Sequence, residues 1–271
     1  MNLRFVQVDA FADRPFGGNP AAVMPLDSWL PDELLQAIAA ENNLSETAFT
    51  VADETGAADY ELRWFTPTTE VALCGHATLA SGFVLIERDE IVFRTRKAGL
   101  LKVGRDGGAL TLDLPVTLVR RAENPALLEA LGTPGAEVYD AYQGTEATTI
   151  VCVEDEAAVR ACTPDMAKLR GIDLMAIVTS PAAPDVGYDV ASRVFVPAWG
   201  VDEDPVTGSA HAALTPFWAE RLGRESFTAF QASRRGGMVA CRLAGERAVL
   251  GGKCVTVIEG AMIIDESGGR E

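Results

Sequence analysis

The sequence predicts a mixed α+β protein made of two similar halves, each a curved β-sheet or barrel around one central helix. Three observations lead to this fold class. Short strand-like stretches recur along the 271-residue chain with few helices between them. The strand pattern "RWFTP" at 63–67 is echoed by "RVFVP" at 193–197, 130 residues later. Each copy is followed by a helix that is apolar on nearly all sides, and such a helix must be buried on all sides.

The first half is predicted to consist mainly of strands. Alternation and β-branched content indicate strands in six stretches; in the last of them Leu110, Leu112 and Leu114 alternate with polar residues, the period-two pattern of a half-buried strand. The six are "LRFVQVDAF" (3–11), "ETAFTV" (46–51), "YELRWF" (60–65), "IVFRTR" (91–96), "LLKVG" (100–104) and "ALTLDLP" (109–115). A helix is predicted over 31–43, because Pro31 suits a first helical turn and acidic residues follow it.

After Pro115 the pattern starts again, which places a domain boundary there. We expect domains at 1–116 and 117–271, with the last strand either in the second domain or returned to the first. The second half is predicted to hold helices over 124–132 and 164–172, and strands over 147–155, 174–180, 188–197 and the tail 237–264. The two central helices are expected in "TLASGFVLI" (78–86) and "ALTPFWAERL" (213–222). Strands and helices do not alternate regularly, so no Rossmann sheet is predicted.

Composition excludes several classes of function. A net charge of −16 and a pI near 4.6 argue against nucleic acid as a partner. The longest uncharged apolar run, 71–86, is short for a membrane span, and the first residues lack the apolar core of an export signal. Five cysteines without a CxxC pair favour a reducing cytoplasm. The absence of GxGxxG and GxxxxGK[ST] lowers the expectation of a nucleotide cofactor, and no cofactor is predicted.

The two helix starts are the candidate binding sites. A helix N-terminus carries unpaired N–H groups and a partial positive charge, so two of them facing one cleft would hold a small carboxylate. Gly75 and Gly208 permit close approach of the backbone to a ligand, or else only a tight strand-to-helix turn. His76 and Ser209 add side-chain donors at the same level, whereas His211 lies deeper in its helix and fits a buried histidine.

Two carboxylates are candidate acid–base groups. Asp204 precedes Pro205 in a turn aimed at the second helix start, where it could orient a histidine, touch a substrate amine or only complement the helix dipole. Glu46 lies at the mouth of an apolar strand, as an acid–base group or as a strand-edge carboxylate.

Cys74, just ahead of the first helix, is expected to have a lowered pKa and could act as a base. The comparable position before Gly208 is Thr207, which cannot replace a second thiol. No metal site is predicted, because Cys74 and His76 form the only close Cys/His pair and zinc sites need three or four ligands.

Four stretches resemble the PhzF-like (phenazine biosynthesis) family: "VDAFADRPFGGNPAAV" (8–23), "NLSETAF" (43–49), "LRWFTPTTEVALCGHATLA" (62–80) and "DEDPVTGSAHAAL" (202–214). The resemblance implies a diaminopimelate epimerase-like fold with the site between its halves. It implies that Glu46 shuttles a proton, that His76, Asp204 and Ser209 surround the substrate, and that Asn19, Gly75 and Gly208 contact it. It also suggests a homodimer.

The sequence therefore predicts a cofactor-independent isomerase acting on a small carboxylate-bearing substrate. The family reaction it resembles is the isomerisation of trans-2,3-dihydro-3-hydroxyanthranilate. Two alternatives stay open: an amino-acid racemase or epimerase using Cys74 with Glu46, and a non-catalytic small-molecule binding protein of the same fold.

Overall fold

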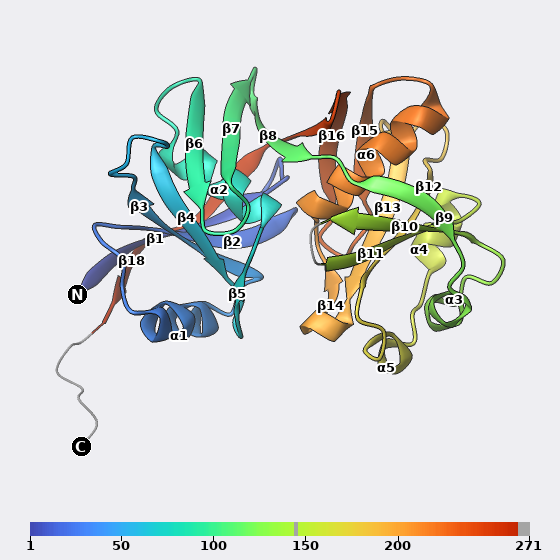
Figure 1. Ribbon diagram of the computed structural model, residues 1–271, viewed down its shortest axis with the longest axis horizontal. Helices are drawn as coiled ribbons and strands as arrows, with labels where there is room; N and C mark the ends of the chain where they lie inside the picture. Colours follow the sequence, from blue (N-terminus) through green and yellow to red (C-terminus); the bar gives the residue numbers. More distant parts are fainter. Residues whose placement is uncertain (144–145, 265–271) are drawn as a thin grey trace. The chain divides into compact units, whose positions relative to one another are not determined.

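A computed structural model describes residues 1–143 and 146–264, and these residues form two units. Unit 1 contains residues 1–112 together with the end of the chain from Gly252, and unit 2 contains residues 113–251 (Figure 1). The last strand thus lies in the first unit. No helix of the described residues is both long enough and apolar enough to span a membrane.

Unit 1 is mainly β-structure. Its strands are β1 (Asn2–Ala10), β2 (Asn19–Leu26), β3 (Glu46–Ala52), β4 (Tyr60–Phe65), β5 (Glu70–Val71), β6 (Glu90–Thr95), β7 (Leu100–Asp106), β8 (Ala109–Pro115), which continues into unit 2, and β18 (Cys254–Ile263). Its helices are α1 (Asp32–Asn42) and α2 (Gly75–Leu85).

Unit 2 is also mainly β-structure but contains more helices than unit 1. Its strands are β9 (Leu118–Ala122), β10 (Glu137–Gln143), β11 (Glu146–Cys152), β12 (Met175–Pro181), β13 (Val190–Val196), β14 (Val201–Asp204), β15 (Ser226–Gln231), β16 (Gly237–Ala244) and β17 (Arg247–Gly252). Its helices are α3 (Pro125–Leu131), α4 (Glu156–Ala161), α5 (Met166–Leu169), the 3-10 turn η1 (Pro197–Trp199) and α6 (Gly208–Leu222).

Strand pairing is the same in the two units. In unit 1, β1–β2 is antiparallel, β2–β3 parallel, β3–β4 and β4–β5 antiparallel, β4–β6 parallel and β6–β7 antiparallel. In unit 2 the pairs β10–β11, β11–β12, β12–β13, β13–β14, β13–β15 and β15–β16 follow that order and those directions. The predicted fold of two similar halves is confirmed.

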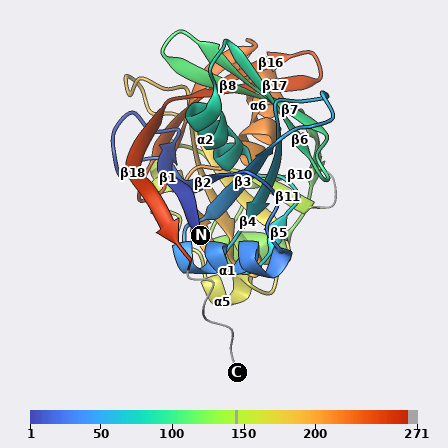
Figure 2. The ribbon, with the colours of Figure 1, turned by 90° about the vertical axis from the view of Figure 1, so that its left-hand side faces the viewer.

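One helix lies at the centre of each unit. Figure 2 shows α2 among the strands of unit 1, and it contacts β1, β2, β3, β7 and β18. Its first eight residues, Gly75 to Gly82, are all buried. Helix α6 packs on β16 and β9, is buried over most of its length, and continues through Pro216. Outside the sheets, α1 covers one face of unit 1 and α3, α4 and α5 cover one face of unit 2.

Capping residues explain where the outer helices begin and end. Helix α1 follows Pro31, has Asp32 and Glu33 in its first turn, and ends at Asn43 in the left-handed conformation. Asn124 caps α3 by accepting a hydrogen bond from the Leu127 N–H, and α3 ends at Gly132, also left-handed. These ends agree with the helices predicted over 31–43 and 124–132.

Each central helix is preceded by the same arginine–glutamate clamp. In unit 1, Arg63 on β4 makes two hydrogen bonds of 2.7 and 2.9 Å with Glu70 on β5, and its guanidinium lies 4.9 Å from the centre of the Phe65 ring. In unit 2, Arg193 and Glu203 repeat the pair at 2.7 and 3.0 Å, again with a ring, that of Phe195, at 4.9 Å. The echoed "RWF" and "RVF" therefore have a structural cause: both clamps tie down the strand pair that leads to a central helix.

Some predicted elements differ from the structure. The helix predicted over 164–172 is shortened to α5, because a turn begins at Arg170. Helix α4 and strand β2 were not predicted. The six strands predicted in unit 1 are all present.

Candidate active site

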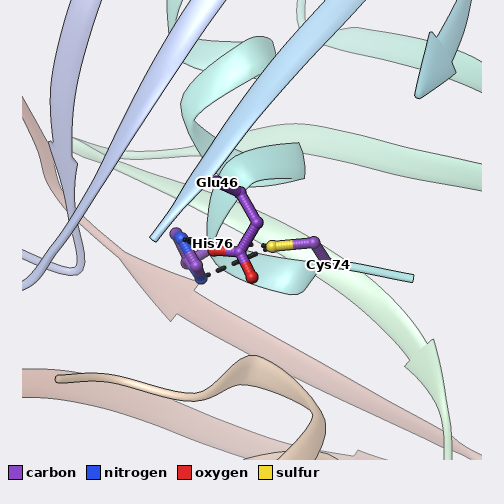
Figure 3. Close-up of side chains that lie close together, drawn as sticks. All are labelled: Glu46, Cys74 and His76. Carbon is purple, nitrogen blue, oxygen red and sulfur yellow. Dashed lines mark hydrogen bonds and ion pairs between the residues drawn. The ribbon is translucent and has the colours of Figure 1, made fainter. Parts of the chain in front are cut away.

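The residues predicted for the first helix start meet in unit 1. Asn19 and Glu46 are the first residues of β2 and β3, and these parallel strands are adjacent with Ala21 opposite Glu46. Cys74 is the N-cap of α2, and Gly75 and His76 form its first turn. The register of β2 and β3 thus brings two strand starts to the first turn of the central helix. Figure 3 shows Glu46 beside Cys74 and His76.

His76 is the centre of this group. Its Nε2 atom lies 2.9 Å from Oε2 of Glu46, and its Nδ1 atom lies 3.1 Å from Nδ2 of Asn19. The sulfur of Cys74 lies 3.5 Å from Nδ1 and 4.0 Å from Nε2. The His76 side chain is 5% exposed and that of Glu46 is 17% exposed, so Glu46 is the member that reaches solvent.

Asn19 holds the His76 ring through its Nδ1 atom. Its Oδ1 accepts a hydrogen bond of 2.9 Å from the Ser45 hydroxyl, which turns Nδ2 toward His76 Nδ1. This orientation matches a neutral ring with its proton on Nε2. The reversed amide would match a charged ring and would keep its bond to Ser45, because a hydroxyl both donates and accepts. Asn19 can therefore serve either charge state of His76.

Burial and neighbouring charge act in opposite directions on this group. Burial, followed by the negative charge of Glu46, raises the pKa of Cys74 to about 11. The predicted lowering of the thiol pKa is wrong, because loss of solvent outweighs the helix N-terminus. Burial lowers the pKa of His76, but contacts with Cys74 and Glu46 oppose it and raise that pKa above its ordinary value. Since the thiol is uncharged at neutral pH, we attribute the upward shift to the Glu46 carboxylate.

Glu46 Oε2 is buried but lacks a hydrogen bond within the part of the chain that the structure describes. It touches His76 Nε2, yet the contact does not have hydrogen-bond geometry. A buried carboxylate oxygen without a donor is unusual and needs an explanation such as a catalytic role or an ion.

The fold also adds a third residue to the Cys74–His76 pair. One ligand atom each from Glu46, Cys74 and His76 lie within 4.8 Å of one another. The sequence analysis counted only Cys74 and His76 as neighbouring metal ligands. It missed Glu46, because residue 46 is far from residue 74 in the sequence and only the fold brings them together.

The residues predicted for the second helix start meet in unit 2. Thr207 is the N-cap of α6 and donates a hydrogen bond from its hydroxyl to the Asp204 carboxylate. Gly208 and Ser209 form the first turn of the helix. No side-chain capping bond is made at either helix start, so the N–H groups of both first turns keep their donor capacity.

Sequence reasoning missed Gln231, which holds the second helix start in place. This fully buried residue accepts a hydrogen bond from the Thr207 N–H at 2.9 Å and donates one to the Asp204 carbonyl at 2.7 Å. A glutamine at the end of a strand carries no signal in the sequence; only the β13–β15 pairing brings it beside this turn.

The matching registers show which residues are equivalent. Thr47 faces Phe65 in unit 1 and Ala176 faces Phe195 in unit 2, so Glu46 corresponds to Met175. Trp64 is paired with Val71 in unit 1, and Val194 is paired with Asp204 in unit 2. Asp204, the second candidate carboxylate, therefore corresponds to the apolar Val71.

Along the helices, Cys74 corresponds to Thr207 and His76 to Ser209. His211 corresponds to Thr78: each side chain donates a hydrogen bond to the carbonyl of its N-cap residue. The two histidines are therefore not equivalent, and the two helix starts carry different chemistry on one scaffold.

Known proteins are similar in sequence to this chain over nearly its whole length. The model of a family described as phenazine biosynthesis-like protein matches residues 8–260. The chain belongs to this family. An uncharacterised isomerase of Pseudomonas aeruginosa is 48% identical over 270 residues, covering 97% of this chain and 99% of that protein.

Solved structures agree with the family and the fold. A PhzF family protein of Enterococcus faecalis has a TM-score of 0.88 at 40% identity, covering 97% of this chain and 100% of that one. A predicted epimerase of Pseudomonas aeruginosa has a TM-score of 0.76 at 22% identity, covering 97% and 100%, which supports the epimerase-like fold alone.

Proposed function

We propose that this member of the phenazine biosynthesis-like family is a cofactor-independent isomerase that moves a proton between two carbons of a small carboxylate-bearing substrate. The observation that carries the proposal is the buried Glu46 Oε2, which touches His76 and has no hydrogen bond of its own among the described residues. A relative that is 48% identical to this chain is named an uncharacterised isomerase, in agreement with this reaction class.

The proposed step uses Glu46 as the acid–base group. Glu46 takes a proton from one carbon as the double bond shifts, and returns it to another carbon, so no electron acceptor or co-substrate is consumed. The neighbouring His76, held by Asn19, stabilises the charged carboxylate of Glu46 before the first transfer and after the second, and Glu46 is an uncharged acid between them. The reaction that this most resembles is the isomerisation of trans-2,3-dihydro-3-hydroxyanthranilate.

The substrate contacts in this proposal come from the helix starts. In unit 1, the free N–H groups at Gly75 would bind the carboxylate beside Glu46. In unit 2, Gly208, Asp204 and Ser209 at the start of α6 are proposed as further substrate contacts, as the resemblance implies. Ser209 is half-buried, so we expect its side chain to be within reach of a ligand.

The racemase alternative has less support. A two-base racemase needs a second base, but Cys74 has its pKa raised to about 11 by burial, and the counterparts of Cys74 and Glu46 in unit 2 are Thr207 and Met175. The alternative of a binding protein without activity is an outcome of the test below.

The test is proton exchange in deuterated water. Small carboxylates and amino acids that raise the melting temperature are incubated with the protein, and deuterium incorporation at carbon is followed by NMR. Glu46→Gln removes the base while keeping the shape, so exchange should fall by about 10² to 10⁴ with ligand binding retained. Glu41→Gln, an exposed glutamate at the end of α1, is the matched control and should exchange normally.

Undiminished exchange in Glu46→Gln contradicts the acid–base assignment. Carboxylate binding without exchange in the wild type would instead support the non-catalytic binding protein.

A further inference from the structure

The cluster of Glu46, Cys74 and His76 contains the three donor types that zinc and cadmium prefer. A sulfur, an imidazole nitrogen and a carboxylate oxygen lie within 4.8 Å of one another (Figure 3). Two of the three residues are buried, and Glu46 is partly exposed, which leaves a route from solvent. The cluster thus differs from the exposed acidic groups that are common on protein surfaces.

The spacing of the donor atoms is close to that of a tetrahedral ion. Donors about 2.0 to 2.3 Å from one zinc ion lie about 3.4 to 3.6 Å apart. Nε2 of His76 lies 4.0 Å from Cys74 Sγ and 2.9 Å from Glu46 Oε2. Each separation must change by roughly half an ångström. Rotation of the Glu46 side chain can lengthen the distance to Oε2, and rotation of the Cys74 side chain about Cα–Cβ can shorten the distance to Sγ.

The charge balance and the unpaired oxygen point to the same ligand. A bound thiolate and carboxylate carry two negative charges, which a divalent cation neutralises. Within this cluster, the buried Glu46 Oε2 lacks a hydrogen bond to the described residues, and a cation would satisfy it. Burial, which raises the pKa of Cys74, opposes an isolated thiolate, whereas a metal-bound thiolate has its partner charge beside it.

The second layer of the site is also present. A histidine that binds a metal through Nε2 carries a proton on Nδ1 and donates it to a neighbour. Asn19 faces Nδ1 at 3.1 Å, and its amide, when reversed, accepts that proton while Ser45 receives its N–H. The ring would therefore be held in the orientation and tautomer that coordination requires.

We propose that Glu46, Cys74 and His76 form a three-ligand site for a thiophilic divalent cation such as Zn²⁺ or Cd²⁺, and that the bound ion inhibits the protein. On binding to the charged His76 ring, the Cys74 S–H bond and the His76 Nε2–H bond break, both protons pass to solvent, and the ring keeps its Nδ1–H. A sulfur–metal and a nitrogen–metal bond form with no change of oxidation state. A solvent molecule completes the tetrahedron. The ion occupies the Oε2 lone pair that proton transfer needs; this inhibitory part rests on the proposed function, and the binding part does not.

Binding is tested on the full chain with the metal alone. Cd²⁺ is titrated into the metal-free protein while heat and the sulfur-to-cadmium charge-transfer absorption are recorded. We expect one Cd²⁺ per chain, with affinity lowered at least about 100-fold in Cys74→Ala and lowered in Glu46→Gln. Mg²⁺, which prefers oxygen ligands, should not compete.

Matched variants keep the binding test decisive. Cys162→Ala removes another buried thiol, in unit 2, and should leave Cd²⁺ binding unchanged. The melting temperature of each variant is measured without metal to check that it is folded. If Cys74→Ala does not fold, Cys74→Ser is used in its place. Absence of binding below about 1 mM, binding unchanged in the Cys74 variant, or loss of binding in Cys162→Ala overturns the site.

Inhibition is a separate measurement. With any compound that exchanges deuterium in the wild type, one equivalent of Zn²⁺ should stop exchange, and a chelator should restore it. Continued exchange at full occupancy overturns the inhibitory role but leaves the site. If no compound exchanges at all, the proposed function fails while the Cd²⁺ titration still decides the site.

Discussion

The two histidines show how much the surroundings of a side chain decide its chemistry. His76 touches a carboxylate, and this contact raises its pKa above the ordinary value against the effect of burial. Among the described residues, His211 has no such partner. Its Nδ1–H donates to the Thr207 carbonyl at 2.8 Å, and burial lowers its pKa to about 4. At neutral pH His211 is an uncharged helix residue, whereas His76 is the one that can respond to a ligand.

The low pKa of His211 predicts a loss of stability in mild acid. Well above pH 6.5 the residue is neutral in both states and contributes no pH dependence. As the pH falls from 6.5 toward 4, the unfolded chain takes up a proton that the folded chain refuses, so stability decreases. At pH 5 this cost is about 2 kcal/mol for one such histidine.

His211→Asn keeps a donor near the position of Nδ1 and removes the titration. The free energy of unfolding of the wild type and this variant should be measured by urea denaturation at pH 7.5 and at pH 5. Other titrating groups are common to both proteins, so their difference isolates His211. The variant's deficit at pH 7.5 should shrink by about 2 kcal/mol at pH 5; a constant deficit would contradict the low pKa.

At the scale of elements, the clamps connect the repeated sequence motif to the helix starts. Glu70 lies four residues before Cys74, and Glu203 lies four before Thr207. The side chain of Arg63 is only 1% exposed and also bonds Asp32 of α1 at 2.9 Å. The clamp in unit 1 thus ties together β4, β5 and α1 beside the candidate site.

Removing one partner of this buried pair should be costly. Glu70→Gln leaves the buried Arg63 charge without its bidentate acceptor, and we expect a loss of about 2 to 4 kcal/mol in the free energy of unfolding. Glu259→Gln is the matched control: its pair with Arg4 is 60% and 51% exposed, so the loss should stay below about 1 kcal/mol. Equal losses in chemical denaturation would show that burial does not distinguish the two pairs.

Strand β2 illustrates why some elements escaped prediction. Its sequence "NPAAVMPL" contains two prolines, which argue against an interior strand. In the structure β1 pairs with residues 19–23 and β3 with residues 21–26. Pro20 therefore has a neighbouring strand only on the β1 side, and Pro25 only on the β3 side. The offset between two neighbours, which no local pattern reports, makes the prolines tolerable.

For the whole molecule, the repeat was predictable and its asymmetry was not. Apolar helices and the echoed motif indicate two halves, because both are properties of short stretches. The contact of Glu46 with His76, and its replacement by Met175 in unit 2, depend on strand registers between distant segments. The family resemblance already pointed to Glu46 and His76. The structure adds the reason why only one half carries the carboxylate–imidazole pair.

The chain order of the units predicts that they differ in their ability to fold alone. Residues 113–251 are continuous and contain their own core, so this fragment should fold when expressed by itself. Unit 1 is closed by β18, which pairs with β1 from Asn2 opposite Ile263 to Ala10 opposite Cys254. Gly252, just before it, lies so close to Phe11 that an added Cβ would be 2.3 Å from the ring.

Residues 1–112 without this strand would expose the edge of β1 and the apolar residues that Met262 and Ile264 cover. We therefore expect fragment 113–251 to give dispersed amide NMR signals and cooperative unfolding, and fragment 1–112 to give neither. Joining 252–264 to residue 112 through a flexible linker should restore both properties, since closing a loop costs little compared with a paired strand. A folded 1–112 fragment would contradict this dependence, because β18 would then be an accessory to unit 1 rather than part of its sheet.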